Sequence, residues 1–326
     1  MKKILATLLL FVLTVTLLVS CNTDSGNEQP TKIKIGALSG PTGMGMAKMI
    51  NDNGLDSDKY SFTVFGGPEA AKNAFIAGDV DAICFPTNTA ANLFKALKGD
   101  LYVAAINCLG SLYLLSDSSV EIKDIKELEG KTVYASVPGS TTGAIINHIL
   151  EENDVNANVS FEYNGETLAD HDQLSALISQ GKIDLAILPE PKATATMVQN
   201  PDLGLSIDLN LSAEWEKVSA DSEPLTMGCI IFKKSFVDAN KATVDAFLSE
   251  YKASIEYINA KENNEQAANM IATAGILPKA AVAKRALNNL YGSIVYLDGE
   301  EMKTALKSFY EVIGMVSPEN AFYYEG

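Results

Sequence analysis

The stretch Gly78-Asp-Val-Asp-Ala-Ile-Cys-Phe-Pro86 recurs 103 positions later as Gly181-Lys-Ile-Asp-Leu-Ala-Ile-Leu-Pro189. In each copy, a glycine that can end a helix is followed by a short turn, an aspartate and an apolar strand that stops at proline. Upstream, Ile35–Gly43 and Tyr134–Gly143 form a second matched pair, and each leads from a strand into a helix. These repeats predict two α/β lobes built alike, each presenting a loop and a helix N-terminus to whatever lies between them.

The N-terminal residues read as an export signal rather than as part of the fold. Lys2 and Lys3 precede an apolar run that begins at Ile4 and is short for a membrane span. The run ends in Leu18-Val19-Ser20-Cys21, which matches the lipobox of bacterial lipoproteins. We therefore expect a signal peptide over residues 1–20, a lipid on Cys21 and a flexible tether over residues 21–31. An ordinary secretory peptide with an incidental cysteine is the alternative.

This reading predicts an extracytoplasmic protein that is anchored to a membrane by lipid, either at the cell surface or in the periplasm. Without Lys2 and Lys3, the formal net charge falls from -16 to -18. Such an acidic balance disfavours nucleic acid as a partner. The hydrophobic fraction of 47% is enough for two packed cores.

Three cysteines follow Cys21, namely Cys84, Cys108 and Cys229. An odd number at wide spacing is not a disulfide framework. All three lie in apolar stretches, so we expect buried core thiols. The alternatives to core thiols are a single disulfide pair and an opportunistic metal site.

Strands that alternate with single helices predict a mostly parallel sheet in each lobe, covered by helices on both faces. In the first lobe we expect strands at 32–38, 60–65, 81–85 and 101–107, and helices at 44–52, 69–77 and 89–98. In the second lobe we expect strands at 109–116, 132–136, 159–163, 184–188 and 204–209, and helices at 141–152, 172–180 and 192–199. A strand at 222–232 is expected to return to the first lobe. From Val237 onward we expect helices, with breaks at 275–278 and at 292–299.

The second lobe is thus an insertion in the first. We expect lobe 1 to comprise 32–108 and 229–326, and lobe 2 to comprise 109–228. The chain crosses between them twice, near residues 108–112 and 224–228, and these crossings are the expected hinge.

Two turns carry most of the functional argument. In Pro138-Gly139-Ser140-Thr141-Thr142-Gly143 the glycines allow a tight turn, the hydroxyls can donate, and the first helical N–H groups carry about half a positive charge. Gly40-Pro41-Thr42-Gly43 offers the same groups in lobe 1. The alternative is that Ser140 and Thr42 only cap their own helices. The duplication favours a ligand site, because ligands bind at the carboxyl ends of strands in open α/β sheets.

The sequence gives little support for a nucleotide-binding, catalytic or metal site. Gly40, Gly43 and Gly45 have the spacing G-x-x-G-x-G, which is not a dinucleotide fingerprint, and no Walker lysine follows. The two histidines, His148 and His171, lie in polar helical stretches away from any expected nucleophile. We therefore expect both to be solvated helix residues, and we expect no catalytic residue, metal or cofactor.

The basic side chains limit the classes of ligand that fit the sequence. The chain has one arginine, Arg285, which we expect among C-terminal helices far from the predicted loops. Receptors for carboxylates commonly use an arginine fork, so a free amino acid is disfavoured. A small oxyanion held by N–H and hydroxyl groups, or a neutral heteroaromatic molecule, fits better.

Several side chains near strand ends have two readings. Glu190 either hydrogen-bonds an amine or ring N–H of the ligand or favours the start of the next helix. Aromatic residues either stack on the ligand or belong to the core, and these are Phe65, Phe85, Tyr113 and Tyr163.

A family resemblance rests on three segments. They are Gly78–Ala82 followed by Pro86-Thr87-Asn88, Leu128–Val133 leading into Pro138-Gly139-Ser140, and Leu188-Pro189-Glu190-Pro191. With these residues the chain, from about Lys32 onward, resembles the type II periplasmic solute-binding proteins of ABC importers. The branch it resembles includes nitrate, sulfonate and taurine receptors and receptors for the thiamine pyrimidine precursor.

The resemblance implies a monomeric, non-enzymatic receptor that closes on a small molecule and delivers it to the transmembrane subunits of an ABC permease. The contacts that it implies are Thr42, Gly43, Thr87, Asn88, Ser140, Thr141, Thr142 and Glu190. The wider set expected to line the site adds Ser39, Gly40, Met44, Gly66, Asn107, Gly139, Tyr163 and Met227. The loop Gly40–Met46 is not typical of sulfonate receptors, which leaves the ligand class open.

Two other functions fit the same fold. One is an enzyme, as in the chorismate-dehydrating branch of menaquinone synthesis, although such an enzyme is expected inside the cell. The other is a surface receptor that feeds a signalling partner without transport. A permease gene beside this one would favour transport.

Overall fold

The computed structural model describes residues 31–219 and 223–326 of the chain. The expected signal peptide, Cys21 and the tether as far as residue 30 lie outside the described residues. Lys32–Gly326 forms one compact unit. Within the described ranges, we find no helix that is both long and apolar enough to cross a membrane.

The first sheet has six strands in the order β13-β4-β12-β3-β1-β2. Strand β1 pairs in parallel with β2 and β3, whereas β12 runs antiparallel between β3 and β4. We call this sheet and the helices on it lobe 1. The strands are β1 (Ile33–Leu38), β2 (Tyr60–Phe65), β3 (Ala82–Pro86), β4 (Leu101–Leu109), β12 (Thr226–Lys233) and β13 (Ile294–Leu297).

The second sheet has five strands in the order β11-β5-β10-β6-β7. Strand β6 pairs in parallel with β7 and β10, and β5 runs antiparallel between β10 and β11. We call this sheet and its helices lobe 2. The strands are β5 (Leu112–Ser116), β6 (Thr132–Tyr134), β7 (Asn158–Ser160), β10 (Leu185–Pro189) and β11 (Ser206–Asn210), and a small ribbon joins β8 (Glu162–Tyr163) to β9 (Glu166–Thr167).

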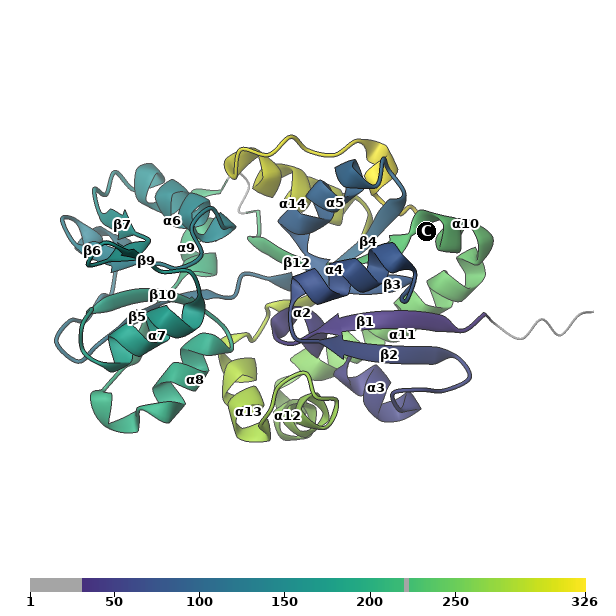
Figure 1. Cartoon of the computed structure of the whole chain (residues 1–326), viewed down its shortest axis with the longest axis horizontal. Coiled ribbons are helices and arrows are strands. Elements are labelled where there is room, and N and C mark those ends of the chain that lie inside the picture. Colours follow the sequence, from purple (N-terminus) through teal and green to yellow (C-terminus); the bar gives the residue numbers. More distant parts are fainter. Residues whose placement is uncertain (1–30, 220–222) are drawn as a thin grey trace, which may run out of the picture. The chain divides into compact units, whose positions relative to one another are not determined.

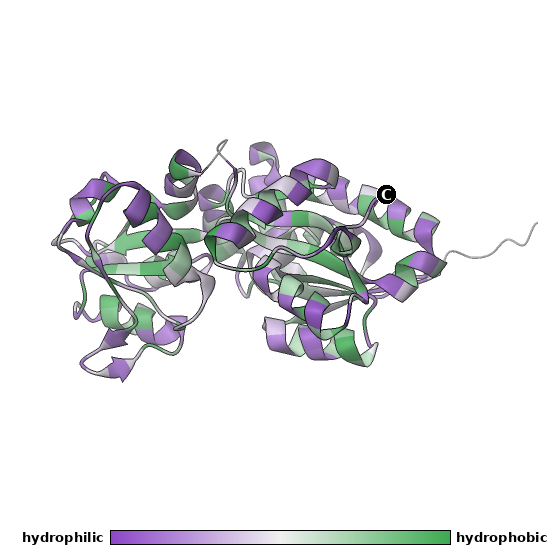
Figure 2. Ribbon diagram, turned by 90° about the horizontal axis from the view of Figure 1, so that it is seen from above, coloured by the Kyte–Doolittle hydropathy of each residue, from purple (hydrophilic) through white to green (hydrophobic). Residues whose placement is uncertain are grey.

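Helices flank both sheets (Figure 1), as the alternating pattern predicts. Lobe 1 carries α2 (Pro41–Met44), α3 (Ala47–Asn53), α4 (Pro68–Ala77), α5 (Thr87–Ala96), α10 (Lys234–Ala239), α11 (Lys241–Asn259), α12 (Asn264–Thr273), α13 (Ala280–Asn289) and α14 (Gly299–Val312). Lobe 2 carries α6 (Thr141–Glu152), α7 (His171–Ser179), α8 (Lys192–Gln199) and α9 (Leu211–Val218). Figure 2 shows apolar residues gathered in the strands, while the outer turns of the helices are hydrophilic.

The core continues from one lobe into the other. One apolar cluster includes residues of β4 and β12 in lobe 1 together with residues of β5 and α6 in lobe 2. The fully buried Trp215 of α9 lies within it, with ring centroids 5.1 Å from His148 of α6 and 6.2 Å from Phe309 of α14. Packed side chains therefore connect the two lobes.

Four elements differ from the expectations. In place of the predicted helix at 44–52 the structure has α2 and α3, which are separated by Gly45 and Met46. The chain packs closely on α11 here, since a Cβ at Gly45 would lie 2.6 Å from Ile255. Helix α9 was not predicted, and β13 forms where a break between helices was expected. After α14 the chain is irregular apart from a short 3-10 turn at Asn320–Phe322, and Tyr323 forms an isolated parallel bridge with Val103 of β4.

All three described cysteines are buried and free, which confirms the expectation of core thiols. Burial raises the pKa of Cys84 and of Cys108 to about 12. These groups are therefore protonated and shielded at neutral pH.

Candidate ligand-binding site

The lobe 1 part of the candidate site is the turn from β1 into α2. Gly40 has a φ of 105°, and a Cβ there would lie 3.8 Å from the Pro191 ring of lobe 2. A Cβ at Gly43 would lie 1.9 Å from the carbonyl oxygen of Leu38, so only glycine fits at this position. The turn thus depends on glycine at both positions and brings its backbone up to a lobe 2 loop.

Asn107 of β4 supports this turn from beneath. It is 1% exposed, and its Nδ2 donates to the carbonyl of Thr42 at 3.2 Å and to the hydroxyl of Tyr251 at 3.0 Å. Its Oδ1 is buried and has no partner among the described residues. Met44 is fully buried in the apolar core beside α3, so it also supports the turn rather than lining a surface.

A second lobe 1 segment is the start of α5. Thr87 is 1% exposed, and its hydroxyl donates to the carbonyl of Thr226 in β12 at 3.1 Å. This hydroxyl therefore ties the start of α5 to β12. Asn88 is half-buried beside it, while the hydroxyl of Thr226 is buried with no partner in the described part of the chain.

The lobe 2 part of the site is the turn from β6 into α6. Gly139 has a φ of 79°, and Ser140 is the N-cap residue. The hydroxyl of Ser140 makes no capping bond, and it is buried without a partner within the described ranges. In lobe 1, Thr42 lies inside α2, whose N-cap is Gly40. The reading that these two residues only cap their helices is therefore not seen in the structure.

The remaining predicted residues differ in exposure. Ser39 and Gly66 are exposed at the ends of β1 and β2, and Thr142 is 8% exposed in the first turn of α6. Thr141, Tyr163 and Met227 are half-buried. Of the aromatic candidates, Phe85 and Tyr113 are core residues, whereas Phe65 is half-buried and the Tyr163 ring packs against Tyr134.

The expectation of solvated histidines is wrong. The Nδ1 atom of His171 lies 2.7 Å from the hydroxyl of Ser136, which is 1% exposed. Burial, reinforced by the charge of Lys192, lowers the pKa of His171, so the imidazole is neutral at pH 7. His148 packs against Trp215, and its Nε2 is buried. Both side chains hold lobe 2 together, and His171 fixes the end of β6 just before the Gly139 turn.

Glu190 is also more buried than expected. It follows β10, is 3% exposed, and donates its N–H to the carbonyl of Ser111 at 2.8 Å. Its Oε1 accepts from the Thr194 hydroxyl at 2.8 Å and from Asn289 Nδ2 at 2.6 Å, and its Oε2 accepts from the Thr194 N–H at 3.2 Å. The bond to the Thr194 N–H agrees with the reading that Glu190 favours the start of α8.

The environment of Glu190 corrects the expectation for Arg285. Burial raises the pKa of Glu190, while the bonds from Asn289 and Thr194 and the charge of Arg285 act in the opposite direction. Arg285 lies on α13, and α13 packs on α8, the helix that follows Glu190. Arg285 is therefore close to the predicted loop that contains Glu190. Thr194 could have been found from its i, i+4 spacing to Glu190, whereas Asn289 carries no local signal that pairs it with a residue 99 positions away.

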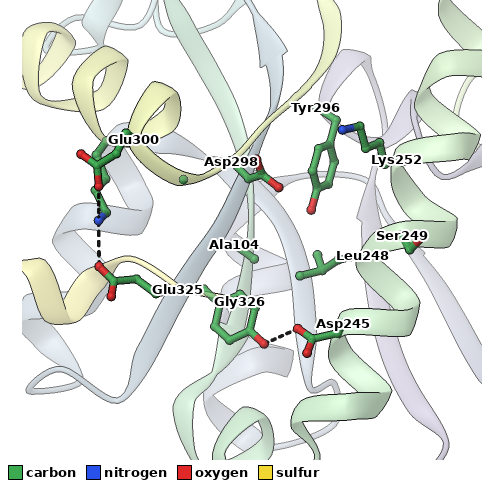
Figure 3. A pocket seen from close by; sticks show the side chains of 13 residues that line it. Ala104, Asp245, Leu248, Ser249, Lys252, Tyr296, Asp298, Glu300, Glu325 and Gly326 are labelled. Atoms are coloured by element: carbon green, nitrogen blue, oxygen red, sulfur yellow. Dashed lines mark hydrogen bonds and ion pairs between the residues drawn. The ribbon is translucent and has the colours of Figure 1, made fainter.

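A pocket of about 630 Å³ opens elsewhere on lobe 1, between α11, β13 and the start of α14 (Figure 3). Its lining shares no residue with the turns described above. At this pocket the hydroxyl of Tyr324 donates to Asp245 at 2.5 Å, and Lys303 donates to Glu300 and to Glu325, both at 2.7 Å. Dashed lines in Figure 3 mark these contacts of Asp245, Glu300 and Glu325. Because these charged groups already pair with each other, we place the candidate site at the strand ends.

Among the described residues, no group of His, Cys, Asp and Glu could hold a metal ion. The two turns described above carry backbone N–H groups and hydroxyls, which are groups that can form hydrogen bonds with a small polar molecule.

Comparison with known proteins identifies a family and several solved structures that the chain is similar to. The family described as NMT1/THI5 like matches residues 102–265. An ABC transporter structure from Parabacteroides distasonis covers 90% of this chain and 99% of its own, at 20% identity and a TM-score of 0.70. The aliphatic sulphonate binding protein SsuA from Escherichia coli covers 91% and 92%, at 17% identity and a TM-score of 0.67. The nitrate-binding protein NrtA from Synechocystis PCC 6803 covers 87% and 81%, at 12% identity and a TM-score of 0.59.

No curated protein sequence matches the chain. The similarity to the solved structures shows that the chain has the two-lobed fold of type II periplasmic binding proteins, as predicted.

Proposed function

Since this chain belongs to the NMT1/THI5-like family, we propose that it is the solute-binding component of an ABC importer and closes on a small molecule between its lobes. The names of the solved structures that it resembles support this proposal, because they are sulphonate-binding and nitrate-binding proteins. Delivery to the permease subunits from outside the cytoplasm follows from the same role.

One observation carries the proposal. The Gly40 turn of lobe 1 and the Ser140 turn of lobe 2 each follow a parallel strand, and open α/β sheets bind ligands at such strand ends. The Gly40 backbone approaches Pro191 of lobe 2, so a ligand bound beside Gly40 would lie next to lobe 2 as well. Contacts made only in the closed state are what allow a ligand to select that state.

The chemistry of the turns suggests the ligand class. Ser140 offers an unused hydroxyl that can donate or accept, and the first turn of α6 offers free N–H groups. The carboxylate of Glu190 already receives three hydrogen bonds, so it is a poor partner for an amine. We therefore propose a small oxyanion such as a sulfonate, or a neutral heteroaromatic molecule.

The test is a binding screen on the purified chain, first by native mass spectrometry for a co-purified molecule. Calorimetry with ethanesulfonate, nitrate and an aminopyrimidine then compares wild type with Ser140→Ala and Thr142→Val. A buried hydroxyl that contacts the ligand contributes about 1 to 3 kcal/mol, or roughly five- to 150-fold in affinity. Thr132→Val, at the exposed beginning of β6, is the control and should bind as wild type does.

Two results would contradict the proposed solute-binding function. One is a chain that binds none of the three probes and carries no co-purified molecule. The other is wild-type affinity in both turn variants, which would leave the turns as structural features.

Membrane attachment through Cys21 is a separate proposal that rests on the lipobox in the sequence. Metabolic labelling with a fatty acid should mark wild type and not Cys21→Ser. If the variant is still labelled and still sediments with membranes, the anchor is elsewhere.

A further inference from the structure

The two lobes are joined by hydrogen bonds where α8 of lobe 2 packs on α13 of lobe 1 (Figure 1). Asn289 is the last residue of α13. Its Nδ2 donates to Glu190 Oε1 at 2.6 Å and to the Thr194 hydroxyl at 3.0 Å. Its main-chain carbonyl accepts from the hydroxyl of Tyr113 in β5 at 2.7 Å. One residue of lobe 1 is thus held at its side chain and at its main chain by three residues of lobe 2.

Burial increases the contribution of these hydrogen bonds to stability. Glu190 is 3% exposed and Tyr113 is 2% exposed. A buried carboxylate is costly unless donors surround it, and hydrogen bonds to a charged acceptor are about twice as strong as neutral ones. Two of the donors to Glu190 come from Thr194 in its own lobe, and the third comes from Asn289 across the interface. Separating the lobes would break that third bond, the bond from Asn289 to the Thr194 hydroxyl and the bond from Tyr113.

The same geometry bears on the role of Glu190. Both of its carboxylate oxygens accept from protein donors, and none of these donors belongs to the Gly40 or Ser140 turn. The side chain is therefore oriented toward α8 and α13. This differs from the ligand contact that the family resemblance implies for Glu190.

We propose that Glu190, Thr194, Tyr113 and Asn289 form a clasp between the lobes, and that Asn289 is the positioning residue that holds lobe 1 against lobe 2 in the closed conformation. The inference rests on the proposed function, since it concerns the closure that would trap the ligand. In this arrangement Glu190 acts on α13 and not on the ligand.

The clasp can be tested on the full chain without any ligand. Asn289→Ala removes the donor to Glu190, and Tyr113→Phe removes the hydroxyl but keeps the buried ring. Asn147→Ala, on the exposed face of α6, is the matched control. Small-angle scattering should give a larger radius of gyration for the two clasp variants than for wild type and the control. The Thr194 amide, which donates to Glu190, should exchange its hydrogen about tenfold faster in Asn289→Ala.

Ligand binding gives a second readout that separates positioning from contact. Ethanesulfonate, nitrate and an aminopyrimidine are the probes. Because closure is common to all ligands, Asn289→Ala should weaken every probe that binds by the same factor, about tenfold, or roughly 1.4 kcal/mol. A ligand contact would instead weaken one probe much more than the others.

Unchanged scattering and unchanged Thr194 exchange in both clasp variants would overturn the clasp. So would a Glu190→Gln variant that abolishes binding of one probe while Asn289→Ala binds as wild type does, since Glu190 would then be a ligand contact. If no probe binds to wild type, the proposed function fails, and the ligand-free measurements still decide the clasp.

Discussion

Gly43→Ala tests whether the lobe 1 turn has the tight geometry on which the candidate site depends. A Cβ at this position would lie 1.9 Å from the carbonyl oxygen of Leu38 and 3.0 Å from its carbon and nitrogen. These atoms belong to the backbone of β1, so no side chain can rotate away to make room. The end of β1 or the start of α2 must move instead.

The size of the effect follows from this clash. Overpacking a buried site costs typically about 1 to 3 kcal/mol, and a contact with the backbone belongs at the upper end of that range. A loss of about 3 kcal/mol in the free energy of unfolding corresponds to roughly 6 to 12 °C in Tm for a domain of this size class. Differential scanning calorimetry of the ligand-free chain measures this directly.

Gly66→Ala is the matched control, because it also follows a strand of lobe 1, and a Cβ there would meet no atom within 4 Å. It should change the free energy of unfolding by no more than about 0.5 kcal/mol. If Gly43→Ala and Gly66→Ala unfold within 1 to 2 °C of each other, roughly 0.5 kcal/mol, the turn does not have the described geometry.

Three further predictions concern the rest of the molecule. Trp215→Ala should lower the free energy of unfolding by about 3 to 5 kcal/mol, because Trp215 packs on His148 of lobe 2 and Phe309 of lobe 1. The variant should still unfold in one transition, and two separate transitions in calorimetry would contradict a shared core. Because the pKa of His171 is lowered, the native state binds fewer protons than the unfolded state at acidic pH. Urea titrations should therefore show the free energy of unfolding falling as the pH drops below about 6.5. His171→Gln should make this dependence on pH weaker. The three described thiols should not react with Ellman's reagent in the native chain and should react fully in guanidinium, whereas rapid native labelling of Cys84 would show that β3 is open to solvent.

Much of the fold could be predicted from the sequence, because its signals are local. The expected helix at 141–152 and the one at 192–199 match α6 and α8, and the repeated Gly-to-Pro stretches end in the parallel strands β3 and β10. Each of these elements combines an apolar period with a defined start or stop. Strand β13 was missed because its four residues are flanked by Gly292 and Gly299, which favour a loop reading on their own.

The two histidines and Arg285 were placed wrongly for a different reason. Their neighbours in the sequence are polar, so the local pattern indicates a solvated face. In the folded chain, Ser136 and Trp215 approach the histidines from other elements, and α8 brings Glu190 to the helix that carries Arg285. No property of the neighbouring residues reports such tertiary contacts.

The same limit explains why the sequence leaves two readings for Glu190. The residue follows a strand end, and at strand ends a carboxylate serves equally well for a ligand or for a helix N-terminus. What separates the readings is the donors that reach it, and one of these, Asn289, is brought there only by the packing of α13 on α8. A hinged receptor needs some closed conformation that is stable enough to be selected and loose enough to open. Asn289 takes part in three hydrogen bonds between the lobes, a number small enough to be broken when the receptor opens. Because one of these bonds occupies the carboxylate of Glu190, we assign Glu190 to closure rather than to recognition.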